Sequence, residues 1–99
     1  MQKYRVLIRG RNLLTAVDGV RQRLGFYTNV FIEALSPTDA ESRAIDLMRD
    51  DVDLREAAFN PLDDPVRFSA EEVIEIDSFA GLRLPRTGLS VFPESTAEP

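Results

Sequence analysis

The sequence predicts one small α+β domain with a mainly antiparallel sheet and its helices on one face of that sheet. Three observations support this class. Two long stretches of strand-like alternation flank an Asp18-Gly19 pair, a capped helical stretch follows them, and two further β-rich stretches come after the helix. The element order is therefore ββα(α)ββ.

The first two strands should form a long hairpin. Residues 3–14 and 21–34 alternate apolar and polar side chains, and Asp18-Gly19 is typical of a type I′ turn, whose central positions both need positive φ. A two-residue turn places Leu7 opposite Val30. A bulge would shift the second strand by one residue and reverse its faces, and Gly10 and Gly25 are the predicted bulge sites.

A helix should begin after Ser36, which can cap free backbone N–H groups and is followed by a proline suited to the first helical position. It should end near Arg49. Its apolar stripe, predicted to face the core, consists of Ala40, Ala44, Leu47 and Met48, with Ile45 beside it. Residues 50–59 form a weaker helical segment, for which Asp51 or Asp53 is the expected N-cap.

The remaining chain should be a loop over residues 60–65, a third strand over 66–77, a loop over 80–87 and a short fourth strand over 89–92. Residues 93–99 have almost nothing to bury and are expected to be a disordered tail, so that residues 1–92 form the domain. A helical crossover that returns the third strand beside the first gives a split β-α-β, ferredoxin-like theme with strand order 2-1-3-4.

Composition excludes several kinds of chemistry. The chain has 99 residues, no Cys and no His, and a net charge of −5. Catalytic triads built on His and metal sites built on imidazole or thiolate are therefore excluded, and we expect no metal and no cofactor. The acidic run at residues 50–53 lacks the glycine and distal glutamate of a calcium loop, so helix capping is expected there.

No stretch is apolar enough to cross a membrane, and charges interrupt the N-terminus. We therefore expect a cytoplasmic protein that does not bind membranes. Overall acidity also argues against a nucleic-acid partner, although arginines and glycines lie near Tyr27 and Phe31.

Charge is distributed unevenly along the chain. Residues 1–30 contain six basic side chains and only one acidic one, Asp18. One interpretation is internal pairing, in which a basic row on the first strand faces an acidic row on the third, with Arg9 near Glu75. The other is a basic surface that meets an acidic partner. The two rows are Lys3, Arg5, Arg9 and Arg11, and Glu71, Glu75 and Asp77.

The hairpin has more large apolar residues than one helix layer can cover, because side chains alternate across a strand. We therefore predict a contact surface on the sheet face opposite the helices. The candidate residues are Arg5, Leu7, Arg9, Arg11, Phe26, Tyr27, Val30, Phe31 and Ile32. In the unbulged register Phe26, Val30 and Ile32 lie on this face, and in the bulged register Tyr27 and Phe31 replace them. The alternative is that the C-terminal segment covers the face.

The first half of the chain resembles a family of small uncharacterised bacterial proteins. The resemblance lies in Gly10-Arg11-Asn12, Asp18-Gly19, Leu24-Gly25-Phe26-Tyr27-Thr28, Glu33-Ala34 and the capped helix from Ser36 to Met48. That family has no assigned activity, so the resemblance implies no functional residue.

These observations favour a non-enzymatic module that binds a protein partner or forms a homodimer through its open sheet face. The alternative is a small-ligand-binding or enzymatic domain whose site is completed across a dimer interface. A deep pocket lined by Tyr27, Asn29 and an arginine would favour that alternative.

Overall fold

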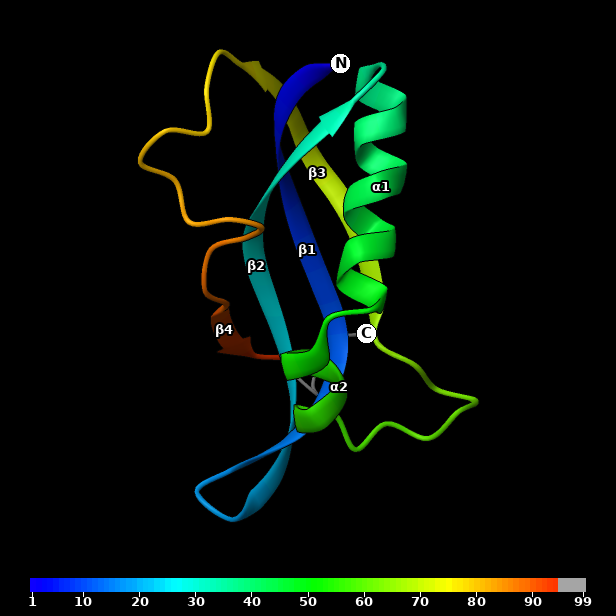
Figure 1. Cartoon of the computed structure of the whole chain (residues 1–99). Helices are drawn as coiled ribbons and strands as arrows, with labels where there is room; N and C mark the ends of the chain where they lie inside the picture. The colour runs from blue at the N-terminus through cyan, green and yellow to red at the C-terminus, as the bar shows by residue number, and fades with distance from the viewer. Residues whose placement is uncertain (95–99) are drawn as a thin grey trace.

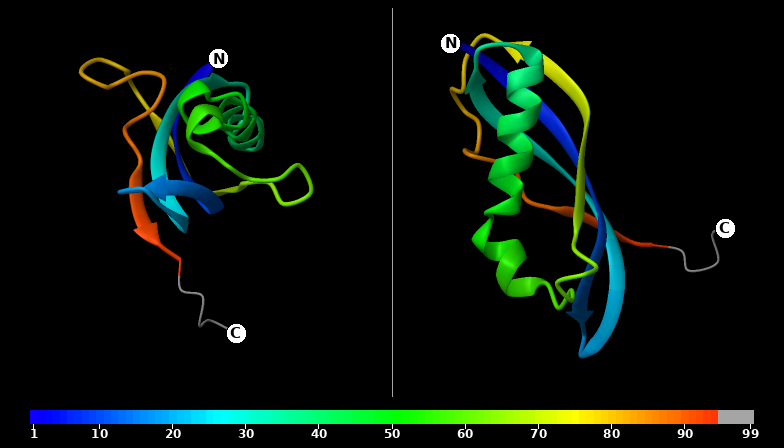
Figure 2. Two further views of the ribbon diagram at one scale, coloured as in Figure 1. Left: turned by 90° about the horizontal axis from the view of Figure 1, so that it is seen from below. Right: turned by 90° about the vertical axis from the view of Figure 1, so that its right-hand side faces the viewer.

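Four strands form one antiparallel sheet, and two helices lie on the same side of it (Figures 1 and 2). The structure is a computed structural model that describes residues 1–94. The α+β class and the antiparallel sheet are confirmed. The elements are β1 (Gln2–Val17), β2 (Val20–Ala34), α1 (Pro37–Arg49), α2 (Val52–Ala57), β3 (Arg67–Ile76) and β4 (Ser90–Pro93).

The hairpin is longer than the alternation predicted, because the turn extends the pairing to its tip. Asp18 and Gly19 have φ of 51° and 80°, the positive values that a type I′ turn requires, and Val17 pairs directly with Val20. In Figure 1 the tip of the hairpin extends below α2. Both valines at the tip are exposed.

The predicted strand order 2-1-3-4 is wrong in the position of the last strand. The sheet has the order β3-β1-β2-β4, so β1 lies between β2 and β3 as expected, but β4 pairs with β2. After β3 the chain crosses to the outer edge of β2. There Phe31 N–H donates to the carbonyl of Pro85 and Thr87 N–H to that of Asn29, both at 2.9 Å. These bonds satisfy backbone groups that an edge strand would otherwise leave free.

The hydrophobic core lies between the sheet and the helices. Helix α1 begins as predicted, with the Ser36 hydroxyl accepting a hydrogen bond from Asp39 N–H at 3.1 Å. The predicted stripe faces the core. The buried residues of this cluster are Tyr4, Val6, Ile8, Leu13, Leu24, Phe26, Val30, Ala34, Ala40, Ala44, Met48 and Leu54.

The first two residues of the predicted tail take part in the fold. Pro93 belongs to β4, Glu94 N–H donates to the carbonyl of Arg23 at 3.0 Å, and the Glu94 carboxylate accepts from Asn12 N–H at 2.8 Å. The rest of the predicted tail, residues 95–99, lies outside the described residues. Neither helix in the described part of the chain has the length and apolar character needed to span a bilayer.

Candidate functional site

A bulge in the hairpin determines which side chains face away from the helices. From the turn to the Leu13–Leu24 pair, β1 and β2 pair in the register that a two-residue turn predicts. Between Leu13 and Gly10 it shifts by one residue, so that Gly10 pairs with Phe26. The bulged alternative is therefore the one that the structure contains.

This register corrects three of the predicted contact residues. Phe26 and Val30 are fully buried on the helix side of the sheet, and Ile32 packs against the same core cluster. All three were candidates for the open face only in the unbulged register. They stabilise the fold from the core instead.

Steric and conformational demands explain why the bulge forms where it does. A Cβ atom on Gly10 would lie 2.0 Å from Cε2 of Phe26, so only glycine allows this aromatic ring to cross the strand. Asn12, in the bulge, has a φ of 64° and donates its side-chain amide to Asp64 Oδ1 at 2.9 Å and to the Pro65 carbonyl at 3.1 Å. Residues 10–12 thus form the bulge, and Asn12 connects the loop before β3 to the hairpin by hydrogen bonds.

The open face, defined here as the sheet surface opposite the helices, contains the other six predicted residues. Cross-strand pairs place Arg5 beside Phe31, Leu7 beside Asn29 and Arg9 beside Tyr27. Arg11 belongs to the same face, since its guanidinium donates to the Ser69 hydroxyl at 2.9 Å. The six are Arg5, Leu7, Arg9, Arg11, Tyr27 and Phe31.

Sequence reasoning missed residues that β3 and β4 add to this face. Ile74 pairs with Arg5 and is 40% exposed, and Phe92 lies with its ring centroid 5.6 Å from that of Tyr27. A search for alternation in the third strand could have found Ile74. Phe92 could not be found in this way, because its position depends on which edge of the sheet the last strand joins.

The C-terminal segment takes up part of the apolar surface that the sequence assigned to a partner. Phe92 packs on Tyr27, and the segment around Pro85 hydrogen-bonds to Phe31, which is only 7% exposed although it lies outside the helix-side core. The apolar part of the predicted contact surface is therefore smaller than expected, and its arginines make up a larger share of what stays exposed.

Most arginines of the open face have internal partners. Arg5 binds Glu72 at 2.8 Å and the side-chain oxygen of Asn29 at 3.0 Å, and Arg11 lies 3.8 Å from Glu71. Internal pairing between β1 and β3 is thus present.

The particular pair of Arg9 with Glu75 is wrong. Glu75 lies opposite Tyr4, and beyond a register shift between Leu7 and Ile8, Arg9 lies opposite Ser69.

Arg9 differs from its neighbours on the open face. Its guanidinium carbon lies 5.8 Å from the ring centroid of Tyr27, a cation–π distance. Its Nε is buried and has no hydrogen-bond acceptor, and no carboxylate among residues 1–94 forms an ion pair with it. A buried donor without an acceptor costs free energy, so this group requires an explanation. Chemically, the guanidinium retains the capacity to bind a carboxylate.

The acidic run after α1 has the capping role predicted for it. The Asp51 carboxylate accepts one hydrogen bond from Leu54 N–H at 3.1 Å and another from Arg86 Nε at 2.7 Å. The hydrogen bond from Arg86 lowers the pKa of Asp51, partly offset by burial, and the same bond raises the pKa of Arg86. Within the described residues no three acidic side chains are grouped closely enough to hold a metal ion.

Compared with known proteins, the chain matches no family model, no curated protein and no solved structure. The resemblance to small bacterial proteins therefore stays a prediction. What can be inferred about function comes from the open face and from the cavities of the fold.

Proposed function

We propose that this chain is a non-enzymatic protein-binding module whose open sheet face receives an acidic segment of a partner, with Arg9 at the centre of the contact. The observation that carries the proposal is that Arg9, partly exposed on this face, forms no ion pair among residues 1–94, whereas Arg5 and Arg11 do. A partner carboxylate would compensate this cation, and interfaces favour arginine beside aromatic and aliphatic residues.

The surroundings of Arg9 support such a contact. Tyr27 holds one side of the guanidinium, while Leu7 and Ile74 offer partly exposed apolar surface nearby on the same face. Arg5 and Arg11 are already bound to Glu72 and Glu71. A polyanion such as nucleic acid would have to displace both glutamates, so an acidic protein segment suits the face better.

A second copy of the chain is one form that the partner can take. The net charge is −5 although residues 1–30 sum to +5 (six basic minus one acidic), so residues 31–99 sum to −10. A homodimer could therefore bring acidic side chains of one copy to Arg9 of the other. A cytoplasmic location fits either form, because the cysteine-free chain needs no oxidising compartment.

The alternative of a ligand site completed across a dimer has less support. Cavities of about 550 Å³ and about 200 Å³ are present, and neither is lined by Tyr27 or Asn29. The ferredoxin-like interpretation, on which such a dimer rested, keeps only the β3-β1-β2 part of its strand order.

The test compares Arg9→Gln with Arg21→Gln. Arg21 is a matched control because it lies on the same hairpin with its guanidinium 4.9 Å from the centroid of Phe59. Light scattering over a concentration range measures self-association, and quantitative affinity purification with wild-type and variant baits finds other partners. We expect Arg9→Gln to weaken the complex about 10- to 100-fold, as for a lost charge-assisted hydrogen bond, and Arg21→Gln to leave it unchanged.

The affinity for the captured partner is then measured by calorimetry at low and high salt. Weaker binding at high salt is expected for a contact between charges. A partner that binds Arg9→Gln as tightly as the wild type, or that binds away from the open face, would refute the proposal.

A further inference from the structure

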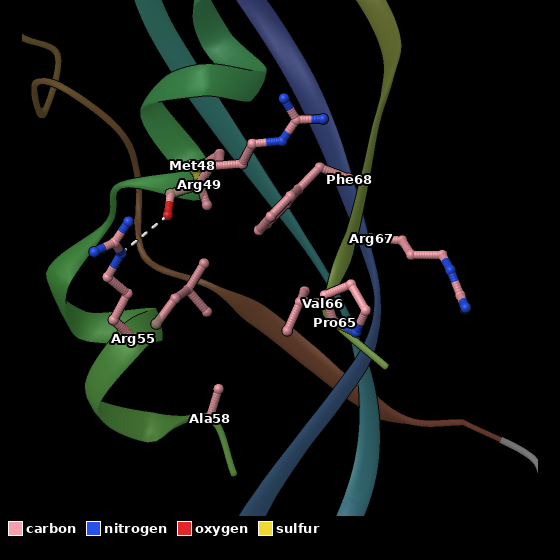
Figure 3. A pocket seen from close by; sticks show the side chains of 9 residues that line it. Met48, Arg49, Arg55, Ala58, Pro65, Val66, Arg67 and Phe68 are labelled. Atoms are coloured by element: carbon pink, nitrogen blue, oxygen red, sulfur yellow. Dashed lines mark hydrogen bonds between the residues drawn. The ribbon is translucent and has the colours of Figure 1, made fainter. Parts of the chain in front are cut away.

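The structure has a second surface feature on the opposite side of the sheet, independent of the open face. We infer that the cavity between the two helices and the start of β3 binds a small amphiphilic anion, meaning a ligand with an apolar body and one carboxylate-like group (Figure 3). Its volume of about 550 Å³ lies in the range of small-molecule sites.

The walls of this cavity are apolar and continuous with the core. Met48 of α1 and Leu54 of α2 line it although they are only 1% and 4% exposed, so the floor of the cavity is the core itself. In Figure 3, Val66 and Phe68 contribute the wall on the side of β3. The Phe68 ring is held edge-on against Phe26, with centroids 6.1 Å apart, which gives this wall a fixed shape.

The charged residues that line the cavity all have the same sign. They are Arg49, Arg55 and Arg67, and no acidic residue is among the nine that line it. This concentration of positive charge stands out in a chain with a net charge of −5. An apolar body would fill the cavity, and a negative group on that body would meet arginine at the rim.

The arginines have carboxylate neighbours outside the cavity, but these pairs are loose. Arg49 lies 3.5 Å from Asp46, and Arg55 lies 3.2 Å from Asp50, with all four side chains at least 66% exposed. Charge-assisted hydrogen bonds in good geometry measure about 2.7–2.9 Å, and exposed pairs such as these contribute little stability. A ligand carboxylate can therefore compete for the same guanidinium groups.

The geometry assigns the anionic group to one end of the cavity. Arg55 Nε donates to the backbone carbonyl of Arg49 at 3.2 Å, which positions the Arg55 side chain where α1 passes into α2. Arg67, in contrast, extends away from the cavity in Figure 3. The Arg49 guanidinium extends away from that of Arg55 in Figure 3, so the ligand's charge would bind at Arg55, and its apolar body would extend toward Val66 and Phe68.

Three probes of equal chain length test this assignment by calorimetry on the full chain: octanoate, 1-octanol and octyltrimethylammonium. We expect octanoate to bind most tightly, octanol more weakly and the cation not at all. Carbon-edited NMR spectra should show octanoate shifting the methyl signals of Met48, Leu54 and Val66. Equal binding of all three probes, no binding of octanoate, or shifts confined to Leu7 and Ile74 on the open face would overturn the inference.

Variants separate the charge from the cavity. Arg49→Gln combined with Arg55→Gln should weaken octanoate binding about tenfold and leave octanol binding unchanged. Arg43→Gln is the control, because Arg43 is an exposed arginine of α1 that does not line the cavity. Ala58→Phe should fill the cavity and abolish the binding of both probes.

Circular dichroism establishes that each variant is folded. If Arg43→Gln weakens octanoate as much as the double variant does, or if folded Ala58→Phe still binds, the inference is wrong. Should Ala58→Phe fail to fold, the exposed arginine variants decide the question alone.

Discussion

Replacing Gly10 with alanine tests the bulge on which the assignment of the two sheet faces depends. The new Cβ would lie 2.0 Å from Cε2 of Phe26 and 2.1 Å from its Cζ, far inside contact distance. Phe26 cannot move away easily, because it is fully buried and packs edge-on against Phe68. Overpacking of this kind costs about 1–3 kcal/mol, and we expect Gly10→Ala to lie at the upper end.

The assay is urea denaturation followed by circular dichroism, with thermal melting as a second measure. For a domain of this size a loss of about 2–3 kcal/mol lowers the Tm by roughly 10–20 °C. Gly88→Ala is the matched control, because a Cβ at Gly88 meets nothing within 4 Å and its backbone is not in the left-handed region. That variant should stay within about 0.5 kcal/mol of the wild type.

A double variant identifies the cause. Phe26→Leu removes the ring atoms that the new Cβ would strike, so Gly10→Ala should cost at least 1 kcal/mol less in the Phe26→Leu background, on the order of coupling seen between residues in contact. If Gly10→Ala is as harmless as Gly88→Ala, or if the two effects at Gly10 and Phe26 simply add, the steric reasoning is wrong.

Three further predictions concern the bulge, an acidic cap and a cross-strand pair. Asn12→Ala should lower the free energy of unfolding by about 2–3 kcal/mol in urea denaturation, because buried hydrogen bonds and a residue suited to φ 64° are lost together. The pKa of Asp51 is lowered in the folded state, so its stabilisation is present above the ordinary value of 3.8 and is lost as the pH falls through the lowered pKa. Acid denaturation below about pH 4 should therefore be steeper for the wild type than for Asp51→Asn, and equal slopes would contradict the assigned bond. Arg5→Glu and Glu72→Arg should each destabilise, and the double exchange should recover about 0.5–1 kcal/mol, whereas additive losses would mean that the pair does not interact.

Local signals in the sequence were enough to predict the elements. Asp18-Gly19 predicts the turn because its positive φ values are a property of two adjacent residues, and Ser36 predicts the helix start because its bond reaches only three residues ahead. The helix that follows places Ala40, Ala44 and Met48 in the core, as its spacing requires.

The position of the last strand had no local signal. Both edges of the three-stranded core, β2 and β3, offer free backbone groups, and the pattern of residues 89–92 suits either edge. Ahead of β4 in the chain, Pro85 and Thr87 already hydrogen-bond to the outer edge of β2. Arg86 between them forms an ion pair with Asp51, the N-cap of α2. A contact between residues so far apart in the chain cannot be derived from periodicity.

The candidate site depends on the two register shifts together. The hairpin bulge places Tyr27, rather than Thr28, beside Arg9, and the β1–β3 shift places Ser69, rather than Ala70, on the other side. With neither shift, Arg9 would lie opposite Thr28 across one strand and Ala70 across the other. Arg5 and Arg11 have carboxylate partners on β3, whereas Arg9 between them forms no ion pair among residues 1–94. Arg9 is also partly exposed on the open face, and for both reasons the proposed contact with an acidic partner is centred on it.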